Sequence, residues 1–239
     1  MCAARGEGLI LIVVLTSLRA SISTPVCCAP DQWEGRLYVD FFVFPYAIHT
    51  YGMADFAYDF INSRTVINAT LVGESPFADP KKKQYSALYL EDYKNYYEYE
   101  LENGVHCEIT KLDVNMTKQC VQGDDNLLFS GIVGEHIITN TYNITLGKSN
   151  PNIRATIERE FFILGSCVPV HLYVKHKVDM STVDVYNVTP DIKDTKIFDI
   201  PPQCKHASPK YRRTMESMHI FKLKIRETLQ QVLFGGRKE

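Results

Sequence analysis

The sequence predicts a mostly β fold, either an antiparallel sandwich or a partly closed barrel. About ten segments alternate apolar and polar residues with a period of two, which is the pattern of half-buried strands. Arg36–Phe44 is the clearest example, because Leu37, Val39 and Phe41 fall on one face of a strand. Glycine, Asn-Pro and Pro-Pro turn signals separate the segments. Many short strands joined by turns favour antiparallel sheets.

The best-defined element is a hairpin between residues 97 and 109, whose turn contains Asn103-Gly104. Asn-Gly is a strong hairpin signal. A two-residue loop would mix charged and apolar residues on one face, whereas a three-residue loop, Glu102–Gly104, keeps one face apolar. We therefore expect the three-residue loop. It pairs Leu101 with Val105, Tyr99 with Cys107 and Tyr97 with Ile109.

Strand patterns continue along most of the chain, and two stretches have helical periodicity instead. The helical stretches are Met53–Asn62 and the C-terminal residues 210–239. The further strands are expected at Thr65–Glu74, Tyr85–Leu90, Leu127–Thr139, Thr141–Leu146, Arg154–Leu164, Val168–Val178, Ser181–Val188 and Lys196–Ile200.

The chain divides into three regions, of which residues 1–23 are predicted to be a secretory signal peptide. An apolar run at 9–15 follows a basic residue, and the small residues Ser21 and Ser23 precede the expected cleavage site. The alternative is a buried N-terminal helix. Residues 24–209 form one β domain, and the sequence predicts a secreted or luminal protein because no other apolar run is long enough to cross a bilayer.

Cysteines and glycosylation sequons support export. Six cysteines remain after the signal peptide, and an even number in an exported chain predicts three disulfides. They are Cys27, Cys28, Cys107, Cys120, Cys167 and Cys204. Four Asn-x-Thr sequons predict outward-facing N-glycans at Asn68, Asn115, Asn143 and Asn187.

The third region, residues 210–239, is a basic amphipathic tail. It carries eight Lys/Arg against three acidic residues, which leaves a net charge of −7 for residues 1–209. That body has no basic stripe of the kind that binds nucleic acid. Apolar residues recur every three or four positions, at Met218, Phe221, Ile225, Leu229 and Val232. Such a helix either lies on an anionic membrane or packs on the sheet, unless the tail is loosely ordered.

No catalytic motif is present, and we expect no enzymatic activity. The chain has no G-x-S-x-G, no H-E-x-x-H and no phosphate-binding glycine loop. His171 and His176 lie in a strand without a carboxylate at motif spacing. The acidic pairs Asp124-Asp125 and Glu91-Asp92 are candidates for an oxygen-rich calcium site, although neither has the spacing of a calcium loop.

Four segments in this order resemble the ependymin-related proteins. The first, residues 27–36, reads C-C-A-P-D-Q-W-E-G-R and resembles their N-terminal motif. Residues 103–120 resemble their hairpin followed by T-K-Q-C, and 166–170 resemble their C-x-P-V. Residues 192–204, ending in F-D-I-P-P-Q-C, resemble their terminal segment. The resemblance covers Cys27 to Cys204, whereas the tail has no counterpart.

The resemblance implies a fold of two antiparallel sheets curved around a hydrophobic pocket, similar to bacterial lipoprotein carriers. It implies a glycosylated, secreted or lysosomal protein that binds anionic lipids, often as a homodimer, with calcium as the candidate cofactor. It also implies the disulfides Cys27–Cys167 and Cys120–Cys204. Cys28 and Cys107 remain for a third bridge, and the rival arrangement is Cys28–Cys167 with Cys27–Cys107.

The expected function is therefore non-catalytic binding of an amphiphile in a hydrophobic pocket. The alternative is an extracellular-matrix or adhesive calcium-binding glycoprotein with a filled core and no bound lipid. The inward-facing candidates for the pocket are Val39, Phe41, Tyr99, Val105, Ile109, Phe161, Ile163, Leu172 and Val174.

Overall fold

The computed structural model describes residues 25–77, 82–113, 115–122, 126–133, 137–144, 152–159, 167–175 and 178–207. The chain is mostly β and forms two antiparallel sheets, as predicted. The strands are β1 (Pro25–Cys28), β2 (Gln32–Val43), β3 (Ile48–Asp59), β4 (Arg64–Glu74), β5 (Lys82–Asp92), β6 (Tyr97–Glu102), β7 (His106–Lys111), β8 (Cys120–Gln122), β9 (Asn126–Val133), β10 (Ile137–Ile144), β11 (Asn152–Arg159), β12 (Cys167–Lys175) and β13 (Asp179–Pro190). Short 3-10 turns are η1 (Phe44–Tyr46), η3 (Thr195–Phe198) and η4 (Pro202–Cys204). The predicted tail helix and signal peptide lie outside the described residues.

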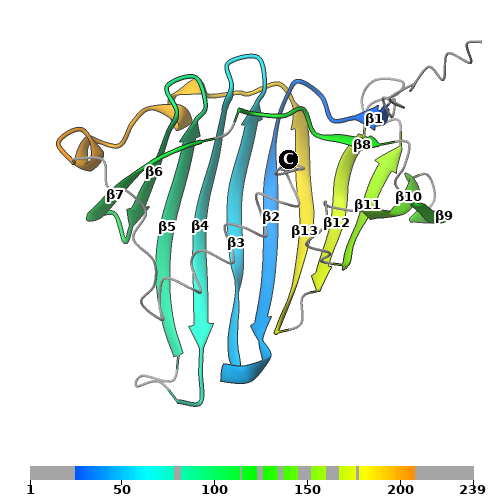
Figure 1. Cartoon of the computed structure of the whole chain (residues 1–239), viewed down its shortest axis with the longest axis horizontal. Helices are drawn as coiled ribbons and strands as arrows, with labels where there is room; N and C mark the ends of the chain where they lie inside the picture. The colour runs from blue at the N-terminus through cyan, green and yellow to red at the C-terminus, as the bar shows by residue number, and fades with distance from the viewer. Residues whose placement is uncertain are drawn as a thin grey trace, which may run out of the picture.

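The two sheets differ greatly in size. Eleven strands form one open sheet in the order β7-β6-β5-β4-β3-β2-β13-β12-β11-β10-β9, and β1 and β8 form a separate two-stranded ribbon (Figure 1). The large sheet consists of two meanders, β2 to β7 and β9 to β13, which meet where β2 pairs with β13. In that pairing Leu37 faces Val185 and Val39 faces Val183.

The predicted helix at Met53–Asn62 is wrong, because β3 continues to Asp59 and a turn follows. The spacing of Ala54, Phe56 and Tyr58 also fits a strand, and all three are buried. Pairing on both sides, with β2 and β4, outweighs the weak helical pattern of this stretch.

The hairpin has a three-residue loop, but its register differs from the prediction. The loop is Asn103–Val105, so that Leu101 faces Cys107 and Tyr99 faces Ile109. Asn103 and Gly104 both have positive φ, as a type I′ turn requires. The Asn103 N–H donates to the Ser86 carbonyl (2.8 Å), and this contact with β5 extends β6 by one residue. The apolar face is as predicted because the shift preserves the alternation.

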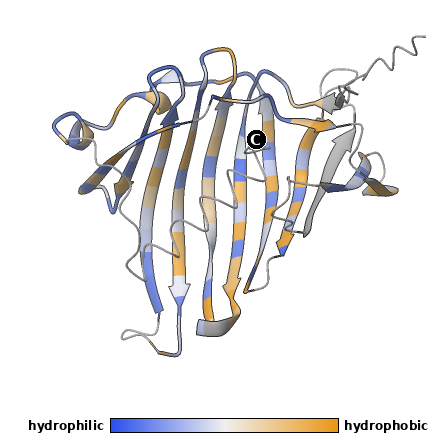
Figure 2. Ribbon diagram, in the orientation of Figure 1, coloured by the Kyte–Doolittle hydropathy of each residue, from blue (hydrophilic) through white to orange (hydrophobic). Residues whose placement is uncertain are grey.

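The apolar side of the sheet changes between its centre and the β7 edge. We call the face with Leu37 and Val39 the inner face, and Figure 2 shows the alternation along β2, β3 and β13. The inner face holds the main core from β5 to β12, formed by Trp33, Leu37, Val39, Phe41, Val43, Ala54, Phe56, Tyr58, Ile67, Ala69, Leu71, Ala87, Tyr89, Val168, Leu172, Val183 and Val185 together with Ala29 of the segment after β1. At the edge the outer face holds a second cluster beneath η3 and η4, formed by Ala57, Val66, Leu90, Tyr99, Ile109, Phe198 and Cys204.

Two segments cross the same end of the sheet (Figure 1). Residues 112–119 lead from β7 to β8 along the inner face, where the Ala29 N–H donates to the Gln119 carbonyl (2.8 Å). Residues 191–207 cross on the outer face, where the Arg64 guanidinium lies 4.2 Å from the centre of the Phe198 ring. This end of the sheet is therefore covered on both faces.

Disulfides fasten these crossing segments, and their pairing corrects the prediction. Cys28 and Cys120 stand opposite each other in the β1–β8 ribbon and are bonded. Cys107 of β7 is bonded to Cys204 of η4, with their Cα atoms 5.3 Å apart. The pairings Cys120–Cys204, Cys28–Cys107, Cys28–Cys167 and Cys27–Cys107 are therefore wrong. The reason is that residues 112–119 carry Cys120 away from the hairpin, and η4 returns to it.

The remaining predicted bridge is Cys27–Cys167. Cys167 is disulfide-bonded, whereas the side chain of Cys27 is outside the described residues. This pair stays a prediction.

Loss of the Cys107–Cys204 bridge is expected to destabilise the fold. A Cys107→Ser/Cys204→Ser variant should lose about 2–4 kcal/mol of unfolding free energy, because the bridge closes a long loop. Denaturant unfolding measures this loss. Non-reducing peptide mapping of the natural protein should yield a Cys107–Cys204 peptide, and a Cys120–Cys204 peptide would contradict the observed pairing.

Gly52 is the tightest glycine of the inner face. It pairs with Val39 and Leu71, and an added Cβ would lie 2.8 Å from Leu71 Cα and closer still to the Thr70 carbonyl oxygen. Both of these atoms belong to the backbone, which cannot move away from an added Cβ as the end of a flexible side chain can.

A Gly52→Ala variant should therefore lose about 2 kcal/mol of stability through overpacking. Gly131→Ala is the matched control, because nothing lies within 4 Å of its Cβ position. Thermal unfolding compares the two variants, and equal melting temperatures would refute the close approach of β3 and β4.

Candidate functional site

The inner face of the large sheet is the first candidate site, because it holds the main apolar core of the described residues. Of the predicted pocket residues, Val39, Phe41, Leu172 and Val174 are buried, with Phe41 fully inaccessible. Register places all four on the inner face. The structure therefore brings together these four predicted residues from β2 and β12.

The other predicted pocket residues are not part of this surface. Tyr99 and Ile109 are buried in the outer cluster under η3 and η4, because the apolar side changes before β6. Val105 is 79% exposed in the hairpin turn, which corrects its inward assignment. Phe161 and Ile163 lie outside the described residues.

Neutral polar groups gather at one end of the inner face. The Trp33 Nε1–H donates to the Gln119 side-chain oxygen (3.3 Å), and the Gln119 backbone N–H donates to the Tyr58 hydroxyl (3.2 Å). Tyr58 in turn donates to the Thr117 carbonyl (3.5 Å). Gln119 Nε2 is buried and has no hydrogen-bond partner among the described residues. A donor is therefore available beside Trp33.

Burial keeps the phenols of this face protonated. The pKa of Tyr58 is raised well above its usual range by burial, although the hydrogen bond from the Gln119 backbone opposes the shift. The pKa of Tyr85 is likewise raised, first by burial and secondarily by Glu102. These hydroxyls stay neutral at physiological pH, so that this surface offers hydrogen bonds without charge.

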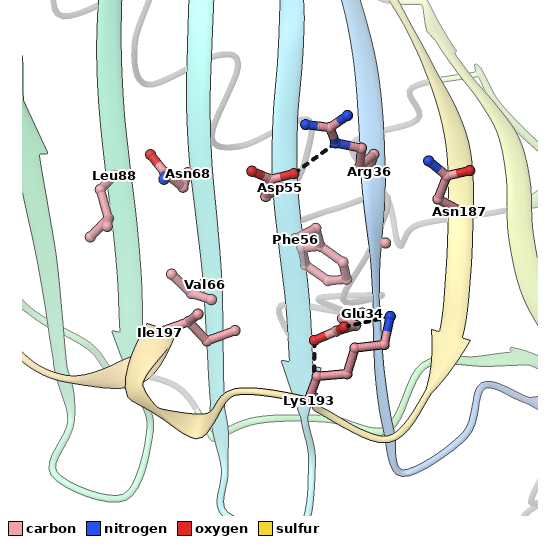
Figure 3. A pocket seen from close by; sticks show the side chains of 11 residues that line it. Glu34, Arg36, Asp55, Phe56, Val66, Asn68, Leu88, Asn187, Lys193 and Ile197 are labelled. Atoms are coloured by element: carbon pink, nitrogen blue, oxygen red, sulfur yellow. Dashed lines mark hydrogen bonds and ion pairs between the residues drawn. The ribbon is translucent and has the colours of Figure 1, made fainter.

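The second candidate site is a groove of about 440 Å³ on the outer face (Figure 3). Arg36 and Asp55 form an ion pair at 3.0 Å across it. Lys193 contacts Glu34 through its Nζ (3.5 Å) and through its backbone N–H (3.2 Å). The remaining walls include Phe56, Val66, Leu88 and Ile197. The groove is therefore polar in its middle and apolar toward η3.

Two predicted glycosylation sites line this groove. Asn68 projects from β4 and Asn187 from β13, and both are exposed (Figure 3). Asn187 lies at a β-bulge with φ of 50°, a conformation that asparagine tolerates better than most residues. A glycan on either residue would extend over the groove, which argues against a small-molecule site there.

The other two sequons differ in exposure. Asn115 is exposed in the crossing segment, and its side-chain oxygen accepts from the Tyr96 hydroxyl (2.9 Å). Asn143 of β10 is half-buried beside the buried Tyr142. Glycosylation stays a prediction at all four positions.

Histidine and carboxylate pairs form across strands, where sequence spacing did not indicate them. His171 Nδ1 lies 2.6 Å from Asp184 Oδ1, because β12 and β13 place these residues opposite each other.

No group of three or more His, Cys, Asp or Glu that could hold a metal occurs among the described residues. The predicted pair Asp124-Asp125 lies outside them. In the other predicted calcium-binding pair, the Glu91 carboxylate accepts hydrogen bonds from the Thr65 and Tyr93 hydroxyls.

Asp59 holds the turn that supports the outer crossing segment. Its buried carboxylate accepts from Gln32, from Asn62 and from Arg64, each side-chain contact at 2.8 Å. Burial opposes ionisation, but these hydrogen bonds outweigh it and lower the pKa of Asp59 below its ordinary 3.8. Because Arg64 also stacks on Phe198, this network fixes η3 on the sheet.

An Asp59→Asn variant should lose about 3 kcal/mol at neutral pH, since it removes a buried hydrogen-bonded carboxylate and leaves the half-buried Arg64 guanidinium without its counterion. The lowered folded-state pKa means that this stability is fully present above about pH 4 and is lost as pH falls through the folded-state value. Thermal unfolding across pH measures it. Asp55→Asn is the control, because its ion pair is mostly exposed and is worth less than about 1 kcal/mol. A difference from wild type that stays constant to pH 2 would contradict this assignment.

These features define a disulfide-bonded antiparallel β protein with one apolar sheet face and exposed sequons on the other. The chain belongs to the Ependymin family, whose model matches residues 79–204. The matched region runs from β5 to η4, so the N-terminal motif lies outside it. A search of curated proteins found no match. The family indicates a secreted glycoprotein and is not known for enzymatic activity.

The described residues include no helix long and apolar enough to cross a bilayer.

Proposed function

We propose that this chain is a non-catalytic carrier whose inner sheet face binds an amphiphile, in the extracellular space or the lysosomal lumen. The observation that supports it most is the inner face itself, which is apolar from β5 to β12. Residues 115–119 and the β1–β8 ribbon lie over one end of that face. An acyl chain gains about 0.8 kcal/mol for each methylene buried on such a surface.

The polar end of the face fits a headgroup. Gln119 Nε2 is a buried donor beside Trp33, and the phenol of Tyr58 is neutral. An anionic oxygen would accept from that donor, whereas a buried unpaired donor costs about 1–3 kcal/mol. We therefore propose that the lipid binds with its acyl chain on the apolar part of the inner face and its headgroup at Gln119.

Trp33 makes this proposal directly measurable. It is the sole tryptophan of the chain and is fully inaccessible to solvent in the inner core. A phospholipid with brominated acyl chains should quench Trp33 saturably, and the unbrominated lipid should not. Native mass spectrometry and lipid extraction of the secreted, glycosylated protein should show the natural ligand.

The matched variant is Gln119→Glu, which keeps an acceptor for the Trp33 N–H and replaces the free donor by an acceptor. It should weaken anionic lipid binding about tenfold and leave neutral lipid binding nearly unchanged. An empty protein that shows no quenching at about pH 5 and pH 7 would overturn the carrier proposal. If the empty protein also self-associates in a calcium-dependent manner, the two results together would favour the adhesive alternative.

A further inference from the structure

Four exposed apolar side chains gather at the end of the large sheet that lies away from the crossing segments. Phe44 and Tyr46 belong to η1 between β2 and β3, Phe77 follows β4, and Val178 precedes β13. Figure 1 shows these three turns at the same end of the sheet. The four residues are 46%, 59%, 82% and 42% exposed, in that order, and we call them the apolar tip.

The register of the sheet places these turns at one level. A single row of cross-strand neighbours runs through six strands, from β12 to β5. The row consists of Lys175, Met180, Phe42, His49, Glu74 and Lys82. Each residue of the apolar tip precedes or follows a member of this row by no more than three positions. The side chains of the tip can therefore reach one surface together.

Local contacts hold the turns of the apolar tip in place. The Phe44 N–H donates to the Val178 carbonyl (2.9 Å), which joins the β2–β3 turn to the turn before β13. The Phe44 ring packs edge-on against the Phe42 ring, with their centres 5.2 Å apart. The Phe77 N–H donates to the Ser75 hydroxyl oxygen (3.3 Å). A preformed surface of this kind loses little conformational entropy when it meets a partner.

Lysines flank the apolar tip on both sides of the sheet. Lys82 and Lys83 begin β5 and Lys175 ends β12, and all three are exposed. Lys82 is paired with Glu74 (2.7 Å), whereas Lys83 and Lys175 have no ion pair with another described residue. Register places Lys83 on the inner side and Lys175 on the outer side. Because residues 1–209 carry a net charge of −7, free cations at this end are a local feature.

The combination fits a membrane surface better than it fits a protein. Single exposed apolar residues need no explanation, whereas a cluster of them marks an interaction site. Aromatic side chains favour the boundary between headgroups and acyl chains, and lysines beside them are attracted to anionic lipids. The turns of the tip offer no free strand edge, so a partner protein cannot bind there by strand addition. An anionic bilayer is therefore the partner that this chemistry favours.

We propose that the apolar tip docks the protein on an anionic membrane. Its aromatic residues enter the interfacial region, and Lys83 and Lys175 lie at the headgroups. The crossing segments cover the opposite end of the sheet, so the sheet stands on the membrane by its uncovered end. Phe41 and Val43 of the inner face directly precede η1, which brings the apolar face close to the bilayer. The docking itself does not depend on lipid binding by the inner face.

Vesicle sedimentation of the natural full-length protein tests the docking. Wild type should bind vesicles of phosphatidylcholine with phosphatidylserine more tightly than vesicles of phosphatidylcholine alone, and added salt should weaken that binding. Tyr46→Ser/Phe77→Ser should bind at least about tenfold more weakly, because two aromatic side chains no longer leave water. Ile61→Ser/Val105→Ser is the matched control, since these residues are 65% and 79% exposed in turns away from the tip. Equal binding by the two double variants would overturn the proposal.

Charge reversal tests the role of the lysines. Lys83→Glu/Lys175→Glu should weaken binding to the phosphatidylserine vesicles at least about tenfold and reduce its dependence on salt. Lys94→Glu/Lys111→Glu is the control with the same charge change at exposed positions near the other end of the sheet, and it should bind like wild type.

The basic tail is the competing membrane contact, and Lys222→Glu/Arg226→Glu tests it in the same assay. Loss of binding in this tail variant, with wild-type binding in the Lys83→Glu/Lys175→Glu variant, would assign the membrane contact to the tail and overturn the proposal.

Fluorescence gives an independent readout of the contact. In a Phe77→Trp variant the added indole should shift its emission to shorter wavelength on phosphatidylserine vesicles, whereas an Ile61→Trp variant should show no shift. Trp33 is fully buried and adds a constant background. A shift at high protein concentration without lipid would assign the tip to a second copy and overturn membrane docking. The vesicles carry no bromine, so this result is separate from the Trp33 quenching that tests the carrier proposal.

Discussion

The ladder between β2 and β13 is the interaction on which the rest of the structure depends. Residues 32–43 pair with residues 179–190, which lie far along the chain. Without this ladder the strands would form two separate meanders. Because the ladder places Leu37 and Val39 beside Val185 and Val183, the apolar rows of both meanders become one continuous inner face. Long-range pairing of this kind brings an entropic cost that only the joined core offsets.

The change of apolar side near the β7 edge explains how the two faces differ. η3 and η4 cover the outer face there, so Tyr99 and Ile109 turn outward beneath them. The same alternation turns Glu98 and Glu100 inward. One sheet thus carries an apolar centre and an acidic edge on its inner face, and a salt-bridged, sequon-lined groove on its outer face. Lipid binding is a proposal about the apolar part of that inner face.

Sequence patterns predicted local properties well and long-range placement poorly. The alternation at Val39, Phe41, Leu172 and Val174 identified inner-face residues, because strand period depends on each segment alone. The same alternation at Tyr99 indicated an apolar side of the strand. It could not indicate which segment would pack on that side. Hairpin register shifted because Asn103 bonds to Ser86 of a third strand. Disulfide partners were wrong because they depend on where the crossing segments run.

The sequence by itself determined the mostly β fold, the faces of individual strands and the exposed positions of Asn68, Asn115 and Asn187. These properties follow from alternation and turn residues within a few positions. Only the tertiary structure decided the single open sheet, the bridges Cys28–Cys120 and Cys107–Cys204, the His171–Asp184 pair and the inward positions of Glu98 and Glu100. The physical reason is that each of them joins residues brought together by strand order, and many strand orders satisfy the same local pattern.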